Sequence, residues 1–299
     1  MFTSKLKKIN SLFFVILLFA LIAVPIKAQE LSAEEIIAKH LDSIGSQQVR
    51  STVKTRMALG TSEFIIKVPY GLVSGKALLA SEADNILFLS SFASVDYPLE
   101  RVGFFKSKIN VPFIKPGVRS PLGTYLMFNS KILSEGLFAG SILSTWALLD
   151  LKNSKANITN GGRKKIDGRE TYILNYIPKG GFGSDSSFKL FFDAENFRHL
   201  RTEYHQKIPT KSYPIGVMGQ ADLVSASNLL VEEFGSFKAV DGLTLPHSYT
   251  ASLRIDAVTG TNEYQWNIKI SQYAFNQKFE PELFNFDKPV AGGAKKNSY

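Results

Sequence analysis

The chain has 299 residues, a formal net charge of +9 and no cysteine. The absence of cysteine excludes disulfides, thiolate metal sites, a cysteine nucleophile and a lipid-modified N-terminal cysteine. With 44% apolar residues, a chain of this length can bury a core without covalent cross-links.

The first 28 residues have the layout of a secretory signal peptide. Lysines precede an apolar run from Leu12 to about Val24, and Ala28 closes a cleavage site before Gln29. An uncleaved membrane anchor is the alternative, but the run is shorter than the ~20 residues that span a bilayer. Residues 1–28 hold four lysines and no acid, so their removal lowers the net charge from +9 to +5. That balance does not indicate a nucleic-acid partner.

The segment from Leu31 to Ile44 is predicted to be a helix. Ser32 and Glu35 have the spacing of a capping box, apolar residues follow at helical spacing, and Gly45 supplies a stop. His40 lies on or beside the apolar stripe, where a packed histidine is expected rather than a ligand.

Most of the remaining chain is predicted to form strands. The period-two pattern from Val49 to Leu59 continues through Phe64 and Ile66, as in a strand with one buried face. Asp-Gly pairs at 167–168 and 241–242 predict hairpin turns. Further strands are expected at 76–81, 85–91, 102–114, 157–165, 169–177, 188–192, 197–206, 228–238, 243–255 and 263–273.

The hairpin FKLFFDAENFRHLRTEY, from Phe188 to Tyr204, shows clear alternation in its second strand. One face is predicted to be solvated and carries His199, Arg201, Glu203 and His205. The other face, with Leu200 and Tyr204, is predicted to join Leu190 on the inner side of the sheet.

Three other segments differ from the strands. Residues 92–150 contain several prolines and then an apolar stretch without charge between Glu135 and Asp150, which predicts one or two short helices covered on several sides. Residues 207–225 form a long loop, and residues 287–299 are predicted to be a disordered tail. Residues 29–286 are predicted to form one domain.

No catalytic or metal-binding pattern stands out. His199 and His205 are six residues apart, about 20 Å along a strand, so they cannot share one metal. Asp167, Asp193 and Asp241 lie at turns, where aspartate is favoured for local hydrogen bonds. The stretch GLVSGK lacks the spacing of a phosphate-binding loop. The sequence predicts no enzyme, no metal and no cofactor.

The order of elements resembles the LolA-type family of periplasmic lipoprotein carriers and related lipoprotein-binding sensor domains. The resemblance covers most of residues 31–286 and is carried by LSAEEIIAKHLDSIG, FKLFFDAENFRHLRTEY and FKAVDGLTLPHSY. It implies an α+β, mostly β fold: a strongly curved antiparallel sheet, or half-barrel, with an N-terminal helix and short helices over its concave side. It also implies a periplasmic location and a cavity for acyl chains. The carriers hold a lid shut with an arginine, for which Arg50 and Arg56 are candidates that no motif distinguishes.

We therefore expect an exported binding or carrier protein that holds a lipid or lipoprotein acyl chain. The alternative is a non-catalytic envelope sensor or scaffold module that binds a protein partner and uses the loop 207–225. Under either interpretation, envelope or membrane proteins are expected among the partners. The oligomeric state is left open. The residues expected to line the cavity are Val53, Met57, Phe64, Ile66, Leu190, Tyr204 and Trp266. Those expected in the lid are Leu126, Phe128, Leu137, Phe138 and Trp146. The competing interpretation is that these residues pack together as a closed core.

Overall fold

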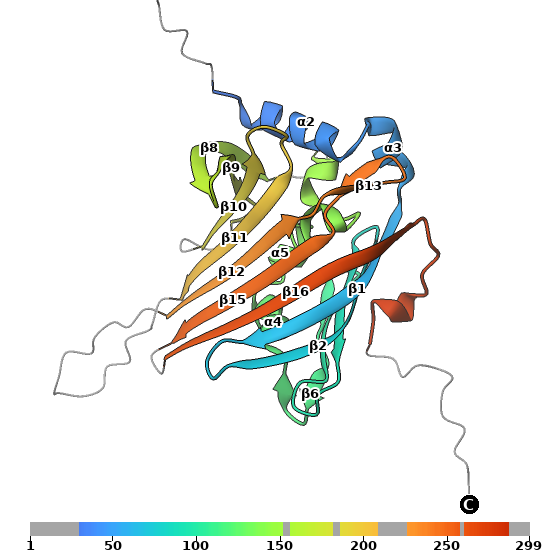
Figure 1. Ribbon diagram of the computed structural model, residues 1–299, viewed down its shortest axis with the longest axis vertical. Helices are drawn as coiled ribbons and strands as arrows, with labels where there is room; N and C mark the ends of the chain where they lie inside the picture. The colour runs from blue at the N-terminus through green and yellow to red at the C-terminus, as the bar shows by residue number, and fades with distance from the viewer. Residues whose placement is uncertain (1–29, 152–155, 182–185, 209–225, 258–259, 287–299) are drawn as a thin grey trace, which may run out of the picture. The chain divides into compact units, whose positions relative to one another are not determined.

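The computed structural model describes residues 30–151, 156–181, 186–208, 226–257 and 260–286. The predicted signal peptide, nearly all of the loop 207–225 and the tail 287–299 lie outside these residues. Within the compact unit that begins at Ser32, the chain forms a 12-stranded antiparallel sheet with short helices on one side (Figure 1). The mostly β, antiparallel half-barrel predicted from the sequence is confirmed.

The strands of the large sheet follow a simple order. From edge to edge it is β5-β4-β3-β2-β1-β16-β15-β12-β11-β10-β9-β8. Their bounds are β1 Thr55–Ile66, β2 Gly71–Glu82, β3 Asn85–Phe92, β4 Leu99–Phe105, β5 Lys108–Asn110, β8 Asn157–Ile166, β9 Arg169–Ile177, β10 Ser186–Asp193, β11 His199–Ile208, β12 Ala226–Gly235, β15 Ser248–Ala257 and β16 Gly260–Phe275.

Two small hairpins and seven helical segments complete the described part of the chain. The hairpins are β6 Phe113–Lys115 with β7 Val118–Arg119, and β13 Lys238–Val240 with β14 Leu243–Leu245. The helical segments are α2 Ala33–Ile44, α3 Gln47–Thr52, α4 Pro121–Phe128, α5 Lys131–Ser134, and the 3-10 turns η1 Gly140–Ile142, η2 Ala147–Asp150 and η3 Pro281–Leu283.

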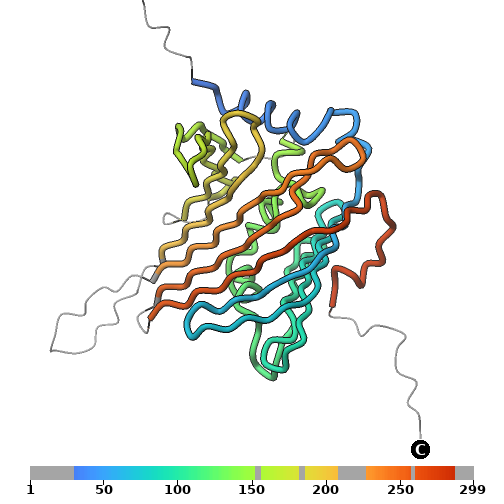
Figure 2. The backbone as a smooth tube through the Cα atoms, viewed as in Figure 1, coloured from blue at the N-terminus to red at the C-terminus, as the bar shows by residue number. Residues whose placement is uncertain are grey.

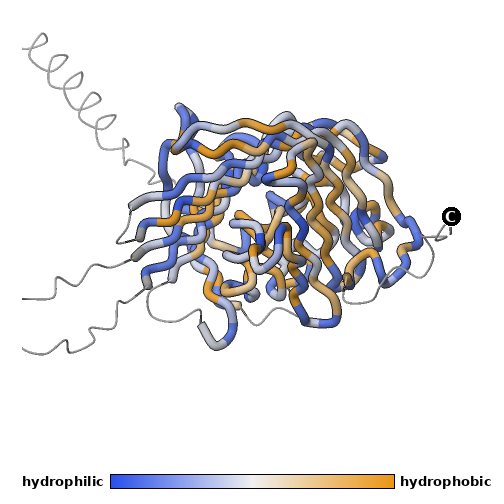
Figure 3. Tube along the Cα trace, turned by 90° about the horizontal axis from the view of Figure 1, so that it is seen from below, coloured by the Kyte–Doolittle hydropathy of each residue, from blue (hydrophilic) through white to orange (hydrophobic). Residues whose placement is uncertain are grey.

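The order of the strands explains why residues 120–151 lie on the concave side of the large sheet. The first and last strands, β1 and β16, pair in the middle of the sheet, as Figure 2 shows. The two edges are therefore β5 and β8, which are consecutive among the strands of this sheet. The connection between them must cross from one edge to the other. Residues 120–151 of this connection, with α4, α5, η1 and η2, are here called the cover, and Figure 3 shows the sheet curving around them.

The N-terminal helix follows the prediction closely. The Ser32 hydroxyl accepts a hydrogen bond from the Glu35 amide, and the Glu35 carboxylate accepts one from the Ser32 amide, so the capping box is complete. The helix buries its apolar stripe, including Ile36, Ile37 and His40.

The strand predicted from Val49 is wrong over its first part. Residues 47–52 form α3, whose N-cap Ser46 accepts a hydrogen bond from the Val49 amide, and β1 begins only at Thr55. A favourable local cap thus prevails over a period-two pattern. Arg50 consequently lies on a helix, where it donates to the Leu41 carbonyl at 2.6 Å, and not on the first strand.

A bulge in β11 corrects the predicted faces of the central hairpin. Phe191 pairs with Arg201 and Phe192 pairs with His199, so Leu200 is the extra residue. The bulge interrupts the alternation, and His199 is buried instead of lying on a solvated face with His205.

The cross-strand register assembles one continuous row on the concave face. Leu190 pairs with Thr202, Thr202 with Glu232, Glu232 with Ala251, Ala251 with Trp266, and Trp266 with Phe64. Because directly paired residues point to the same face of a sheet, this row runs across six strands beneath the cover.

The convex face carries a smaller core at one corner. Ala80, Leu87 and Phe284 are buried there under the segment that contains η3. Gly103 is needed at this point because a Cβ atom would lie 2.4 Å from the Phe284 carbonyl oxygen.

Candidate functional site

Five of the predicted cavity residues share the concave face. Phe64, Leu190, Tyr204 and Trp266 are essentially inaccessible to solvent, and Ile66 is half-buried near the end of β1. The structure places these side chains on the same face of the sheet, the face on which the cover lies.

The other two predicted cavity residues lie elsewhere. Met57 pairs with Ala80 and therefore shares its face with the small convex core. The inward position beside it belongs to Arg56, which the alternation of apolar residues did not anticipate. Val53 is the C-cap of α3 and lines a hollow of about 590 Å³ between α2, α3 and η2.

Four of the predicted lid residues form the inner surface of the cover. Leu126, Leu137, Phe138 and Trp146 are buried, and the Phe138 ring packs edge-on against Phe88 of β3. Phe128, the last residue of α4, is 82% exposed and is therefore not part of this inner surface.

An arginine holds the backbone of the cover. The Arg56 guanidinium donates hydrogen bonds to the carbonyls of Ser141 and, at 3.5 Å, Leu143. It is buried, and burial lowers its pKa to about 10. Its Nε atom has no hydrogen-bond partner within the described ranges. Burying a charge with incomplete hydrogen bonding costs free energy, which offsets part of what this contact contributes.

The buried carboxyl of Glu232 holds the cover at Ala139, two residues before Ser141. Glu232 of β12 accepts a hydrogen bond from the Ala139 amide at 2.8 Å and lies 2.5 Å from the hydroxyls of both Tyr204 and Tyr249. Burial raises its pKa to about 7, although these hydrogen bonds act in the opposite direction. The Tyr204 hydroxyl also lies 3.0 Å from the Leu137 carbonyl.

A second buried carboxyl fixes the start of the cover. Glu100 of β4 accepts hydrogen bonds from the Tyr97 and Ser120 hydroxyls and, at 3.1 Å, from the Gly123 amide in the first turn of α4. An acidic group at a helix N-terminus satisfies amides that have no partner within the helix. Burial raises the pKa of Glu100 to about 7.

Two buried histidines hold the last part of the cover. His40 Nδ1 donates to the Phe197 carbonyl at 3.0 Å, and His40 Nε2 accepts from the Trp146 indole at 3.1 Å, which requires a neutral ring. Burial lowers the pKa of His40 to about 4. The His199 ring stacks on Trp146 with centroids 4.8 Å apart. These histidines are packing partners, and among the described residues no group of three or more acidic or histidine side chains could hold a metal.

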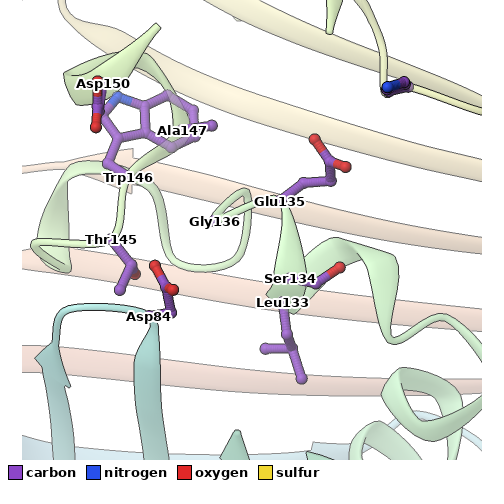
Figure 4. Close-up of a pocket in the computed structure, with 10 residues that line it drawn as sticks. Asp84, Leu133, Ser134, Glu135, Gly136, Thr145, Trp146, Ala147 and Asp150 are labelled. Carbon is purple, nitrogen blue, oxygen red and sulfur yellow. The ribbon is translucent and has the colours of Figure 1, made fainter. Parts of the chain in front are cut away.

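Two hollows that residues of the cover help to line have mixed polar and apolar walls. One of about 380 Å³ lies between the β2–β3 turn and the cover, with the carboxylates of Asp84, Glu135 and Asp150 on its walls (Figure 4). Within the described residues, no helix is both long enough and apolar enough to cross a bilayer. The apolar side chains Phe64, Leu190 and Trp266 of the concave face are buried.

The sequence analysis did not identify Glu100 and Glu232 as site residues, and it did not distinguish Arg56 from Arg50. A signal was present for Glu232, because it stands between Leu230 and Phe234 at the inward positions of an alternating strand. A charge at such a position in a predicted strand indicates a buried polar contact.

Comparison with known proteins finds distant similarity at the level of structure. No protein-family model matches the chain, and no curated protein matches it significantly. A structure named as an outer membrane lipoprotein-sorting protein domain from Vibrio parahaemolyticus is 14% identical, with a TM-score of 0.43, over 84% of this chain and 95% of that chain. A LolA superfamily protein from Nitrosomonas europaea is 12% identical, with a TM-score of 0.44, over 85% of this chain and 98% of that chain.

A third structure, a DUF1329 family protein from Desulfovibrio piger, is 12% identical, with a TM-score of 0.38, over 84% of this chain and 96% of that chain. The LolA-type resemblance seen in the sequence recurs among these structures.

Proposed function

We propose that this chain is an exported, non-catalytic periplasmic protein that binds a lipid or lipoprotein acyl chain against the concave face of its sheet. The observation that carries the proposal is the arrangement of that face. A row of buried side chains that includes Phe64, Leu190 and Trp266 is covered by one continuous segment, which sheet side chains hold largely through its backbone. An acyl chain would take the place of the cover.

An acyl chain would gain free energy from burial against the concave face. Burying one methylene contributes about 0.8 kcal/mol, so a chain of about 16 carbons gains on the order of 10 kcal/mol from an apolar surface. The closed state instead buries the guanidinium of Arg56 and the carboxyl of Glu232, both of which water would solvate if the cover moved away. Burial of charged groups reduces the net stability of such a contact.

The cover also contains the backbone freedom that movement requires. Gly136 and Gly140 adopt positive φ values of 67° and 47°, and they flank the apolar pair Leu137 and Phe138. Glycine adopts these conformations at little cost, so the chain can rearrange on either side of the pair.

A reversible cross-link provides the test. The Ser81 and Ser144 hydroxyl oxygens are 2.8 Å apart, one on β2 and one on the cover, and the chain has no native cysteine. The double variant Ser81→Cys/Ser144→Cys would therefore form one defined disulfide that fastens the cover to the sheet. Binding of a fluorescent fatty acid is measured before and after reduction.

We expect the oxidised variant to lose binding and the reduced variant to bind as the unmodified chain does. The two single-cysteine variants serve as controls for the substitutions themselves. Equal binding by the oxidised and reduced forms would show that the cover does not need to move. Failure of the unmodified chain to bind any acyl probe, or to carry lipid in native mass spectrometry, would refute the function.

A further inference from the structure

A buried carboxyl and two buried phenols lie together where the sheet contacts the cover. Glu232 stands on β12, between β11 with Tyr204 and β15 with Tyr249, three neighbouring strands in Figure 1. All three side chains are essentially inaccessible to solvent. Their protons are therefore shared among protein groups and not with bulk water.

The two oxygens of the Glu232 carboxyl have different surroundings. Oε1 lies 2.8 Å from the Ala139 amide nitrogen and 2.5 Å from the Tyr249 hydroxyl, so two donors occupy its lone pairs. Oε2 lies 2.5 Å from the Tyr204 hydroxyl. A proton on this carboxyl consequently belongs on Oε2.

The Tyr204 hydroxyl lies between two acceptors and has one proton. It is 2.5 Å from Glu232 Oε2 and 3.0 Å from the Leu137 carbonyl oxygen of the cover. Because a hydroxyl donates a single hydrogen bond, it cannot serve a carboxylate and the carbonyl together. If Oε2 carries a proton, the carboxyl donates to Tyr204 and Tyr204 donates to Leu137, so each of these groups has a partner.

Ionisation of Glu232 changes this arrangement. Tyr204 then donates to the carboxylate, because a charge-assisted hydrogen bond is the stronger of its two options. The Leu137 carbonyl keeps the Gly140 amide, at 3.4 Å, as the one donor that the described residues offer it. A buried carbonyl that loses its donor and a buried negative charge both cost free energy in the closed state.

The other ionisable groups around this site keep their protonation state near neutral pH. Tyr125 of α4 also faces Glu232, and burial raises the pKa of this phenol and of both tyrosines that contact the carboxyl. Arg56, which holds the next part of the cover, has a pKa of about 10. Residues 136–144 of the cover contain no acidic, basic or histidine side chain. Burial raises the pKa of Glu232 itself to about 7, so near neutral pH it is the group at this site that titrates.

We propose that the protonation state of Glu232 controls how firmly the sheet holds residues 136–144 of the cover. The protonated carboxyl holds them through both Leu137 and Ala139, and its ionisation gives up the contact with Leu137. Local opening of the cover thus becomes easier as the pH rises, because water solvates the carboxylate once the cover has moved away. This inference does not rest on acyl-chain binding, because it concerns only the contacts of the closed cover.

Hydrogen exchange followed by mass spectrometry tests the proposal. The protection of amides 136–144 in the unmodified chain is compared at pH 5 and pH 8, after correction for the intrinsic exchange rate at each pH. Residues 33–40 of α2 serve as the internal reference. We expect the protection of the cover segment to fall by about tenfold or more toward pH 8, and that of α2 to fall less.

Three variants identify the group responsible. Glu232→Gln retains an oxygen for Ala139 and an N–H donor for Tyr204, as the protonated acid does, so the cover should be protected almost equally at both pH values. Tyr204→Phe removes the donor to Leu137 at every pH and should lower the protection already at pH 5. Glu233→Gln, one residue away on the outer face, should keep the pH dependence of the unmodified chain.

The comparison between variants also accounts for Glu100, which titrates in the same range at the start of the cover and is present in all of them. The proposal is overturned if the pH dependence of amides 136–144 persists in Glu232→Gln. It is also overturned if Tyr204→Phe protects these amides at pH 5 as well as the unmodified chain does, a result that is independent of whether Glu232→Gln folds. An equal loss of protection in α2 and in the cover would show that ionisation acts on the whole fold instead.

Discussion

Arg56 of β1 and Ser141 of the cover are joined by a hydrogen bond from a buried guanidinium to a backbone carbonyl. The donor lies on the concave face of the central strand, and the acceptor lies in η1, between the glycines and Trp146. Because the acceptor is a backbone group, the contact depends on the position of the cover and not on the identity of its side chain. Arg56 therefore binds the cover through its backbone and not through a particular side chain of it.

Replacement of Arg56 is expected to loosen the cover. Arg56→Ala leaves the Ser141 and Leu143 carbonyls buried without this donor, and losing a buried charged partner costs about 3 kcal/mol. Arg56→Lys keeps one donor and should lose less. Denaturant unfolding followed by fluorescence of the two tryptophans, one on the cover and one on the sheet, measures the difference. Arg169→Ala, at the exposed start of β9, should change the unfolding free energy by no more than about 0.5 kcal/mol.

Glu232 is expected to make stability depend on pH. Burial raises its pKa from 4.5 to about 7, so between these values the folded state binds its proton more tightly than the unfolded state does. Its contribution to the unfolding free energy consequently falls as the pH rises through this interval. In Glu232→Gln that dependence is absent. The unfolding free energy of the variant relative to the unmodified chain should rise by up to about 3 kcal/mol between pH 5 and pH 8.

The variant Glu233→Gln is the control that separates the effect of the buried Glu232 carboxyl from that of an exposed one. Glu233→Gln changes the next residue, which lies on the outer face and pairs with Arg201. His40 and Glu100 titrate in both proteins, so their effects cancel in each difference. Parallel pH profiles of Glu232→Gln and the unmodified chain would disprove a raised pKa at Glu232.

Local chemistry in the sequence was sufficient to predict most elements. The Ser32–Glu35 box, the Asp-Gly turns and the alternation of apolar residues act over a few residues, and the structure contains the corresponding helix and hairpins. The strand predicted from Val49 is wrong at its start because local chemistry acts there too. Ser46 caps a helix over residues 47–52, and the period-two pattern gives no sign of that cap.

The composition of the site depended on contacts distant in sequence. Arg56 meets Ser141 across 85 positions, and Glu232 meets Ala139 across 93. The bulge at Leu200 turned His199 inward, and only the pairing of β10 with β11 reveals it. Strand periodicity therefore identified apolar residues of the concave face, whereas the polar contacts that hold the cover required the sheet register.

Gly140 is expected to tolerate no side chain. Its φ is +47°, and a Cβ atom would lie 2.9 Å from His199 Nδ1 and 3.0 Å from the Phe234 ring. Gly140→Ala should therefore add steric crowding to backbone strain and lower the unfolding free energy by about 3 kcal/mol. Gly117 also has positive φ, at +77°, but open space around it, so Gly117→Ala should cost only about 1 kcal/mol. Thermal or denaturant unfolding of both variants gives the difference, and equal losses would contradict crowding at Gly140.

Tyr97 is expected to couple the sheet to the start of the cover through its hydroxyl. The Trp266 indole donates to that hydroxyl at 3.2 Å, and the hydroxyl donates to Glu100, which in turn caps α4. Tyr97→Phe leaves the Trp266 N–H buried without this acceptor and removes a donor from Glu100. The expected loss is about 1–3 kcal/mol of unfolding free energy, with a change in tryptophan emission. Tyr70→Phe removes the same atom from a residue that is 73% exposed, so it should alter neither quantity. Identical behaviour of the two variants would show that the hydroxyl of Tyr97 does not stabilise the cover.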